Sequence, residues 1–305
     1  MSLKTVKKRL DKVIDHKFIE EGVSMAGYTS FKAGGPADLL VSPRSAAELQ
    51  QVLKILAEED CPYVILGNGS NLLVRDGGYR GVMVRIGDAF DFVRTDGNCL
   101  CCGAGTLLSV AARTASAEGL AGLEFASGIP GTVGGGVFMN AGAYGGELAQ
   151  VLKSVRLVSK DGREILTMTV AELEMDYRYS RIQETGHIVT EALFALEPGD
   201  GEEIRRRIAD FTARRNAKQP VAYPSAGSFF KRPQGHFAGK LIEDAGLRGL
   251  SIGGAQVSEL HCGFIINKKD ATATDILQLM EVVQATVLDR FGVKLEPEVR
   301  IIGEE

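Results

Sequence analysis

Glycine is concentrated in one block of this 305-residue chain, and that block constrains the fold more than any other feature. Nineteen of the 37 glycines fall within residues 67–146. Glycine adopts positive φ angles readily and lets a ligand approach the backbone closely, at a cost in chain entropy. The block therefore predicts either a β-rich region with many tight turns or a backbone cradle for a ligand, and composition alone leaves both open.

Charge and hydrophobicity exclude several classes of protein. The net charge is −4, with 24% charged and 45% hydrophobic residues, which is ordinary for a soluble globular protein. This balance disfavours binding to nucleic acid through bulk positive charge. The sequence has no uninterrupted apolar run of about 18 residues and no apolar signal segment at its N-terminus. We therefore expect a cytoplasmic protein without membrane insertion and without a nucleic-acid partner.

The cysteines and histidines predict neither disulfides nor a bound metal. Five cysteines, an odd number in a long chain, argue against a secreted disulfide framework. Cys99 and Cys102 have C-x-x-C spacing, but no second pair or nearby histidine cluster completes a zinc site. We expect buried thiols on a strand there.

Apolar periodicity and turn residues predict a chain that mixes helices and strands. A β-α-β unit over residues 38–67 leads into the first glycine loop, and Asp161-Gly162 predicts a hairpin. Helices are expected near 3–13, 45–59, 107–118, 202–217 and 275–291, and strands near 38–43, 63–67, 81–86, 90–95, 99–102, 155–159, 164–168, 187–196, 263–267 and 295–303.

Three glycine-bearing loops could carry chemistry: LGNGSNLL (66–73), SGIPGTVGGGVFMNAGAYGGE (127–147) and PSAGSFFKRP (224–233). Backbone amides in such loops can converge on phosphate oxygens. The dinucleotide fingerprint G-x-G-x-x-G fails because Leu72 stands where the third glycine is needed. Residues 235–241 are one residue too short for a P-loop and end at Leu241, where Ser or Thr should hold magnesium. A nucleotide bound here would need a different cradle.

Six motifs together carry a family resemblance. The loops at 66–73 and 127–147, with TSFKAGGPAD (29–38), DYRYSR (176–181), PSAGSFFKRP (224–233) and LEPEVRIIG (295–303), occur in order along nearly the whole chain. In these motifs the sequence resembles the UDP-N-acetylenolpyruvoylglucosamine reductases, in their shorter type without an added substrate-covering loop. The resemblance implies an α+β fold, with a vanillyl-alcohol-oxidase (PCMH)-type FAD-binding domain in two subdomains and a smaller α+β substrate-binding domain.

The resemblance also implies domain boundaries. FAD-binding subdomain 1 would span 1–78 and be completed by the C-terminal strand 293–305. Subdomain 2 would span 79–215, and the substrate-binding domain 216–292.

The activity implied by the resemblance is a reduction that uses FAD and NADPH. Hydride from flavin N5 would reach the enolpyruvyl group of UDP-N-acetylglucosamine enolpyruvate and give UDP-N-acetylmuramate for peptidoglycan. An enolpyruvyl ether is an α,β-unsaturated carboxylate, so the enzyme must stabilise charge on the carboxylate and protonate the α-carbon. By motif match the catalytic residues are Ser228 as proton donor, with Arg178 and Glu298 flanking the carboxylate. Arginine suits that place because its planar fork can hold a carboxylate through two hydrogen bonds.

The remaining site residues also follow from the resemblance. Lys218 would meet the diphosphate of the substrate, while Arg178 and Ser228 also contact the substrate. Arg232 departs from the other family type, which has asparagine at a substrate contact. The expected FAD contacts are Gly67, Asn68, Gly69, Ser70, Asn71, Ser127, Gly128, Gly131, Thr132, Gly134, Gly135, Asn140, Gly142, Ala143 and Arg215.

Two other functions stay open at this point. One is another FAD-linked oxidase or dehydrogenase on the same scaffold, although neither of the first two glycine loops offers the histidine or cysteine to which many such enzymes tether flavin. The other is a protein that binds a nucleotide without turning it over. The expected partner is a small UDP-linked amino sugar enolpyruvate, and the expected assembly is a monomer or weak oligomer.

Overall fold

The computed structural model describes residues 3–305 and divides them into two compact units. The first unit comprises the described residues up to Glu21, Leu39–Asn68 and Gly81–Arg214. The second comprises Gly22–Asp38, Gly69–Arg80 and Arg215–Glu305. The predicted three-part division, at 78/79, 215/216 and 292/293, stays a prediction.

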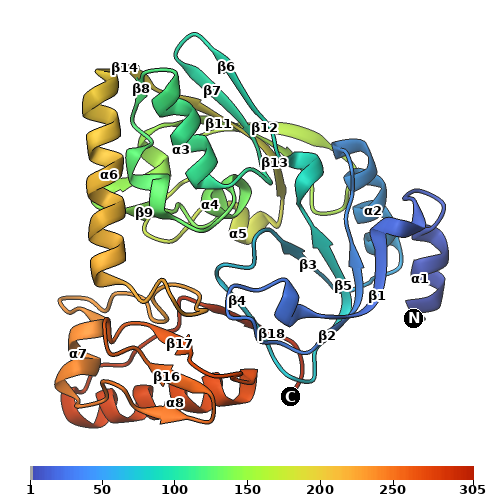
Figure 1. Cartoon of the computed structure of the whole chain (residues 1–305). Coiled ribbons are helices and arrows are strands. Elements are labelled where there is room, and N and C mark those ends of the chain that lie inside the picture. The colour runs from blue at the N-terminus through green and yellow to red at the C-terminus, as the bar shows by residue number, and fades with distance from the viewer. Residues whose placement is uncertain (1–2) are drawn as a thin grey trace. The chain divides into compact units, whose positions relative to one another are not determined.

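Helices and strands are mixed along the chain, as the sequence predicts (Figure 1). The helices are α1 (Leu3–Leu10), α2 (Ala46–Glu58), α3 (Leu108–Ala117), α4 (Val133–Phe138), α5 (Ile182–Thr185), α6 (Gly201–Lys218), α7 (Ala238–Asp244) and α8 (Ala273–Phe291). The longer strands are β1 (Ile19–Ser24), β2 (Pro36–Val41), β3 (Tyr63–Leu66), β4 (Leu72–Val74), β5 (Tyr79–Arg85), β6 (Val93–Asp96), β7 (Cys99–Gly103), β11 (Leu152–Val158), β12 (Ile165–Thr169), β13 (Ile188–Ala195), β16 (Ala255–Val257), β17 (Ile265–Asn267) and β18 (Arg300–Ile302). The two-residue strands are β8 (Leu120–Ala121), β9 (Gly142–Ala143), β10 (Gly146–Glu147), β14 (Glu197–Pro198) and β15 (Ser251–Ile252).

The predicted β-α-β unit is present, but its two strands are not neighbours. The four-stranded sheet has the order β1-β2-β5-β3, so β5 lies between β2 and β3 and pairs with β3 in parallel. Helix α2 joins the two strands. Ser45 caps it by accepting a hydrogen bond from the Glu48 amide at 3.1 Å, as the capping-box spacing predicts.

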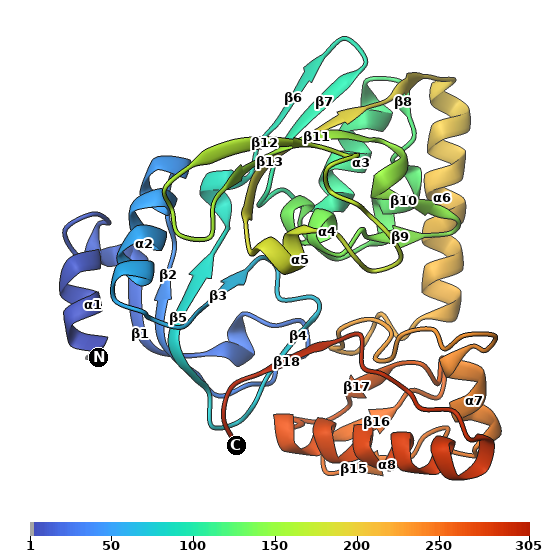
Figure 2. The ribbon, with the colours of Figure 1, turned by 180° about the vertical axis from the view of Figure 1, so that it is seen from behind.

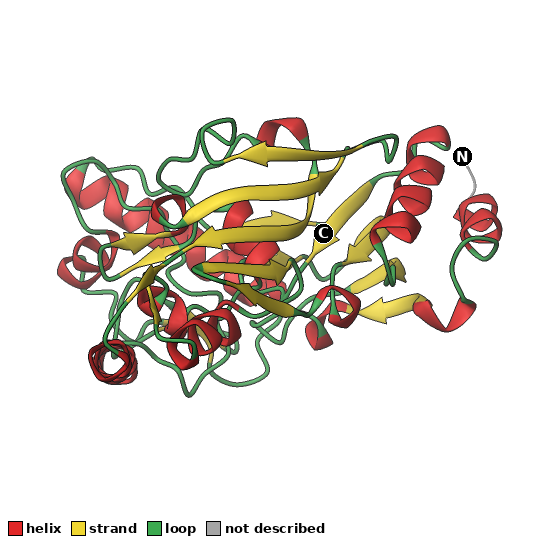
Figure 3. Ribbon diagram, turned by 90° about the horizontal axis from the view of Figure 1, so that it is seen from above, coloured by secondary structure: helices red, strands yellow, loops and turns green. Residues whose placement is uncertain are grey.

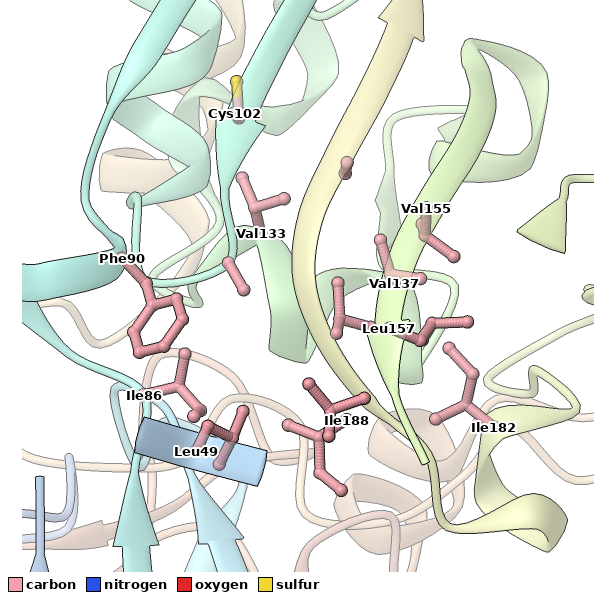
Figure 4. Close-up of a cluster of buried hydrophobic side chains, with 14 of the residues drawn as sticks. Leu49, Ile86, Phe90, Cys102, Val133, Val137, Val155, Leu157, Ile182 and Ile188 are labelled. Atoms are coloured by element: carbon pink, nitrogen blue, oxygen red, sulfur yellow. The ribbon is translucent and has the colours of Figure 1, made fainter. Parts of the chain in front are cut away.

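The first unit contains a five-stranded sheet of order β12-β11-β13-β7-β6, and its pairings are antiparallel (Figure 3). Its apolar side chains pack with α4. Figure 4 shows Val137 of that helix near Val155 and Leu157 of β11, and Val133 nearer to Cys102 of β7. This core fixes the position of the glycine-rich segment that contains α4.

Helix α4 is the main departure from the sequence prediction, which treats residues 127–147 as a loop. Three glycines disfavour a helix intrinsically, yet here tertiary packing requires two of them, Gly134 and Gly136. A Cβ on Gly136 would lie 2.9 Å from Leu108 Cδ1, and one on Gly134 would lie 2.9 Å from Ala104 Cβ. Only residues without a side chain let α4 approach Ala104, which follows β7, and Leu108 of α3 this closely.

The second unit contains the sheet β15-β16-β17, with α8 packed against it, and the parallel pair β4 and β18 (Figures 1 and 2). The C-terminal strand is shorter than predicted: β18 covers only residues 300–302 of the expected 295–303. Pro297 has no N–H and cannot continue a regular ladder, so residues 296–298 pair with residues 229–231 only through an isolated bridge.

Candidate active site

In the first unit the two glycine loops contact each other. The Asn68 side-chain amide donates to the Pro130 carbonyl at 2.7 Å. A Cβ on Gly67 would lie 2.6 Å from Thr132 Oγ1. Thr132 in turn caps α4 by accepting from the Gly135 amide. Residues far apart in sequence thus form one backbone surface around Gly67 and Thr132.

Several polar groups of these loops have no protein partner. Among residues 3–305, the backbone N–H groups of Gly131 and Thr132 make no hydrogen bond, whereas those of Val133 and Gly134 donate to Thr106 and Ala104. The Ser127 hydroxyl oxygen is buried and also has no partner in the described structure. A buried polar atom without a partner is costly, so these groups fit a site whose ligand supplies the missing acceptors. A phosphate-bearing cofactor such as FAD has that chemistry.

The buried side chain of Asn140 bonds to two backbone groups beside the next part of the glycine-rich segment. It is fully buried, has a φ of 42°, and uses its side chain to accept from the Ala149 amide and donate to the Asp176 carbonyl. Gly142 and Ala143 follow it on β9, which pairs with β10. A direct cofactor contact through Asn140 stays a prediction, since the structure accounts for its side chain within the protein.

Arg178 lies in a tight turn beside that segment. Its backbone has a φ of 54°, a strained conformation for a residue with a side chain. The turn is tied to the end of α4, because the Ser180 hydroxyl donates to the Phe138 carbonyl at 2.9 Å. The Arg178 guanidinium donates to the Gly142 carbonyl at 3.5 Å. A strained residue held by its neighbours is typical of functional sites.

The second unit holds the rest of the first glycine loop. Gly69 has a φ of 60°, and its carbonyl accepts hydrogen bonds from the amide and hydroxyl of Ser30. Ser70 is half-buried. The Asn71 side-chain amide donates to the Glu298 carbonyl at 3.2 Å. The predicted cofactor loop is therefore bonded directly to the backbone of a predicted catalytic residue.

Ser228 and Glu298 are brought together by antiparallel backbone pairing. The Glu298 amide donates to the Phe229 carbonyl at 2.8 Å, and Phe230 forms a bridge with Pro297. Ser228 is exposed, although Phe229 beside it is completely buried. The exposed Ser228 hydroxyl thus sits on a firmly anchored backbone.

Arg215 and Lys218, the basic residues predicted to contact FAD and the substrate, lie at the end of α6. The Arg215 side chain donates to the Gln219 side chain at 3.3 Å. Lys218 is exposed and is the last residue of the helix. A basic residue is also favourable there because of the helix dipole.

Sequence reasoning missed residues that support these groups. Asn267, at the end of β17, and Glu124, at the start of the 3-10 helix Glu124–Gly128, are both buried polar residues. Each has a sequence signal that could have revealed it. Asn267 ends the apolar run FII, and Glu124 is an acid between Leu123 and Phe125. Burial of such residues becomes visible only in the fold.

Across residues 3–305 there is no group of three or more His, Cys, Asp or Glu side chains that could hold a metal ion. The helices in the same range include none that is both long and apolar enough to span a membrane.

Comparison with known families accounts for most of the chain. A family model described as UDP-N-acetylenolpyruvoylglucosamine reductase, C-terminal domain, matches residues 219–302. A second model, described as an FAD binding domain, matches residues 37–167.

Curated relatives match nearly the whole length. The UDP-N-acetylenolpyruvoylglucosamine reductase of Clostridium novyi (strain NT) is 51% identical over 300 residues, covering 98% of this chain and 97% of the relative. The enzyme of the same name from Alkaliphilus oremlandii (strain OhILAs) is 50% identical over 298 residues, covering 98% of each.

Solved structures agree on the fold. The crystal structure of UDP-N-acetylenolpyruvylglucosamine reductase from Thermus caldophilus superposes with a TM-score of 0.81 at 38% identity, covering 93% of this chain and 98% of that one. Alkyldihydroxyacetonephosphate synthase is only 16% identical, with a TM-score of 0.50, and covers 65% of this chain and 41% of that one. Together with the FAD-domain match, these likenesses confirm the predicted α+β fold with a PCMH-type FAD-binding domain.

Proposed function

The chain belongs to the UDP-N-acetylenolpyruvoylglucosamine reductase family, and from that premise we propose that it reduces the enolpyruvyl group of UDP-N-acetylglucosamine enolpyruvate to UDP-N-acetylmuramate. FAD is its cofactor and NADPH its reductant. The observation that carries the assignment is the pairing of the Ser228 and Glu298 segments through the Phe229 carbonyl. The names of the relatives favour this reductase over another FAD-linked oxidase.

Two regions of the chain would hold FAD. Ser127, Gly131 and Thr132 offer polar groups without protein partners, which is the donor set that a diphosphate needs. Gly67 and Gly135 leave the backbone bare, while Asn68, Gly69, Ser70, Asn71, Gly128, Gly134, Asn140, Gly142, Ala143 and Arg215 complete the proposed set. When bound, FAD supplies hydride transfer, from NADPH to the terminal CH2 carbon of the enolpyruvyl group.

Residues of the chain would bind the substrate carboxylate and supply the proton for the α-carbon. Arg178 and Glu298 flank the substrate carboxylate, where negative charge develops as the double bond is reduced. The Ser228 hydroxyl gives its proton to the α-carbon, so that hydride and proton together saturate the bond. Because Ser228 is exposed, water can return a proton to it after each turnover.

Lys218, exposed at the end of α6, is proposed to contact the substrate diphosphate. A compact ammonium group suits that role. The cytoplasmic location and the monomeric or weakly oligomeric state stay predictions.

The test separates the two half-reactions. The purified protein should be yellow, lose its visible absorbance with NADPH, and regain it anaerobically with the enolpyruvyl sugar nucleotide. Ser228→Ala should leave reduction by NADPH intact and slow reoxidation by orders of magnitude. Ser225→Ala, three residues earlier in the same segment, is the matched control and should leave both rates near wild type. A colourless protein would exclude both the reductase and the oxidase, and equal losses in both half-reactions would contradict the role of Ser228.

A further inference from the structure

Asn267 is a buried amide that joins three segments of the second unit. It is 7% exposed. Its side chain donates to the Phe31 carbonyl at 2.9 Å and accepts from the Ala271 amide at 2.8 Å, and its backbone amide donates to the Pro224 carbonyl at 2.9 Å. The side-chain bond to Phe31 spans 236 positions of sequence. Asn267 therefore fixes the TSFKAGG segment relative to the start of PSAGSFF.

Phe31 links Asn267 to the segment that contains Ser228, because its ring packs against that of Phe229. The Phe31 ring is completely buried, and its centroid lies 6.1 Å from that of Phe229. Phe229 is the residue that follows Ser228, and it is held at three points. Its amide donates to the Gly263 carbonyl, its carbonyl accepts from the Glu298 amide, and its ring packs on Phe31. The position of the Phe31 ring therefore bears on the orientation of the Ser228 hydroxyl.

The same segment also contacts the predicted cofactor loop. Ser30, next to Phe31, donates to the Gly69 carbonyl through its amide at 3.1 Å and its hydroxyl at 3.4 Å. The turn itself is rigid, since the Thr29 hydroxyl donates to the Ala33 carbonyl at 2.9 Å and Lys32 has a φ of 54°. One short turn thus touches Gly69 on one side and Phe229 on the other.

We propose that Asn267 is a positioning residue for proton transfer: by holding the Phe31 carbonyl it sets the Phe31 ring against Phe229 and so aims Ser228. The proposal rests on the proposed function of Ser228. Proton donation to carbon requires close alignment of donor and acceptor, and a displacement of about 1 Å can cost about 100-fold in rate. A residue far from the reacting atoms in sequence can therefore control the step.

The alternative is that Asn267 only stabilises the fold, and the choice of variants must distinguish this from a positioning role. Asn267→Asp is nearly isosteric and keeps an acceptor for the Ala271 amide, but it removes the donor to Phe31. Gln256→Glu is the matched control. Gln256 lies in the same unit, and its side-chain amide bonds the Gly249 carbonyl and the Ser251 hydroxyl in another turn.

The expected result is a split between the half-reactions. Asn267→Asp should slow reoxidation by the enolpyruvyl substrate about 10- to 100-fold, while flavin reduction by NADPH changes by less than about threefold. Gln256→Glu should show no such split. If Asn267→Asp slows both half-reactions equally, or neither, the proposal is wrong.

A second readout does not depend on bound FAD. In the apoprotein, amide hydrogen exchange of Phe229 and Glu298, whose amides donate to the Gly263 and Phe229 carbonyls, should be faster in Asn267→Asp than in wild type and in Gln256→Glu. Unchanged protection there would contradict the chain of contacts. If Asn267→Asp does not fold, Phe31→Leu decides the question, because it keeps the bond to Asn267 and removes only the ring contact. The same selective loss supports the proposal, and its absence overturns it.

Failure of this proposal and failure of the proposed function are distinguishable. If Ser228→Ala does not selectively slow reoxidation, the role of Ser228 itself is wrong. If Ser228→Ala behaves as expected but Asn267→Asp and Phe31→Leu do not, only the positioning role is wrong.

Discussion

Gly67 lies so close to Thr132 that a Cβ atom added to it would stand 2.6 Å from the threonine hydroxyl oxygen. No positive φ is involved at this glycine, so the close contact with Thr132 Oγ1, and not the backbone conformation, disfavours a side chain. The spacing explains why bare backbone is needed at this point.

Gly67→Ala should therefore weaken FAD binding. Overpacking costs about 1–3 kcal/mol, which corresponds to about 5- to 150-fold in the dissociation constant of FAD. Titration of the apoprotein with FAD, followed by flavin fluorescence, measures the change. Gly27→Ala is the matched control, because a Cβ on Gly27 would meet no atom within 4 Å. If Gly67→Ala binds FAD as tightly as wild type, the loop that contains Gly67 accommodates the added Cβ and the prediction is wrong.

Glu124 should matter more for stability than its ion-pair partner Arg207. The Glu124 Oε2 atom accepts from the Gly122 amide at 2.7 Å, and Oε1 lies 3.7 Å from an Arg207 nitrogen. Glu124→Ala leaves the Gly122 amide without its acceptor, at a cost of about 1–3 kcal/mol. Arg207→Ala removes a side chain that is 54% exposed and should cost less than about 1 kcal/mol. Urea unfolding of both variants tests the ranking, which equal losses would contradict.

Asp76 should stabilise the second unit by binding the start of α8. Its carboxylate accepts from the amides of Ala273 and Thr274 and from the Thr274 hydroxyl, at 2.6–2.9 Å. Asp76→Ala should lower the free energy of unfolding by about 1 kcal/mol, the usual value of such a cap. Asp289→Ala, an exposed acid on the same helix, is the control and should have little effect.

The contribution of Asp76 should also depend on pH. Burial raises the pKa of this carboxyl, but the hydrogen bonds from Thr274 and Ala273 outweigh burial and hold the pKa below the ordinary 3.8. The stabilisation is therefore complete above pH 3.8 and is lost as pH falls through the lower folded pKa. The stability difference between wild type and Asp76→Ala should shrink as the pH falls below 3.8, through the lowered folded pKa. A difference that is constant with pH would show that the charge is not involved.

Cys102 should be unreactive in the native protein. It is completely buried, and burial, with smaller effects of Cys101 and Asp91, raises its pKa to about 12. At pH 8 only about one thiol in 10,000 would then be ionised. Alkylation with iodoacetamide, followed by peptide mass spectrometry, should label Cys102 far more slowly than half-buried Cys99, and at a similar rate after denaturation. Rapid native labelling would contradict the burial.

Caps and turns, which depend on residues close together in the sequence, were predicted correctly from the sequence. The Ser45 cap, the helix that ends before Gly119 and the hairpin at Asp161-Gly162 all form where the sequence places them. In the hairpin, the turn is longer than a two-residue loop, because the Ser159 hydroxyl and Asp161 side chain bond the backbone between 159 and 164. These features depend on neighbours in sequence, so the sequence contains the information.

The sequence by itself determined that bare backbone was needed over 67–146 and, through motif order, which family the chain resembles. The tertiary structure decided what each glycine is near: Gly136 is needed because Leu108 and Leu148 pack on it, and this packing turns a glycine-rich stretch into α4. It also revealed Asn267, whose bond to Phe31 joins residues 236 positions apart. Such contacts depend on how the whole chain packs, and no local pattern of residues records them.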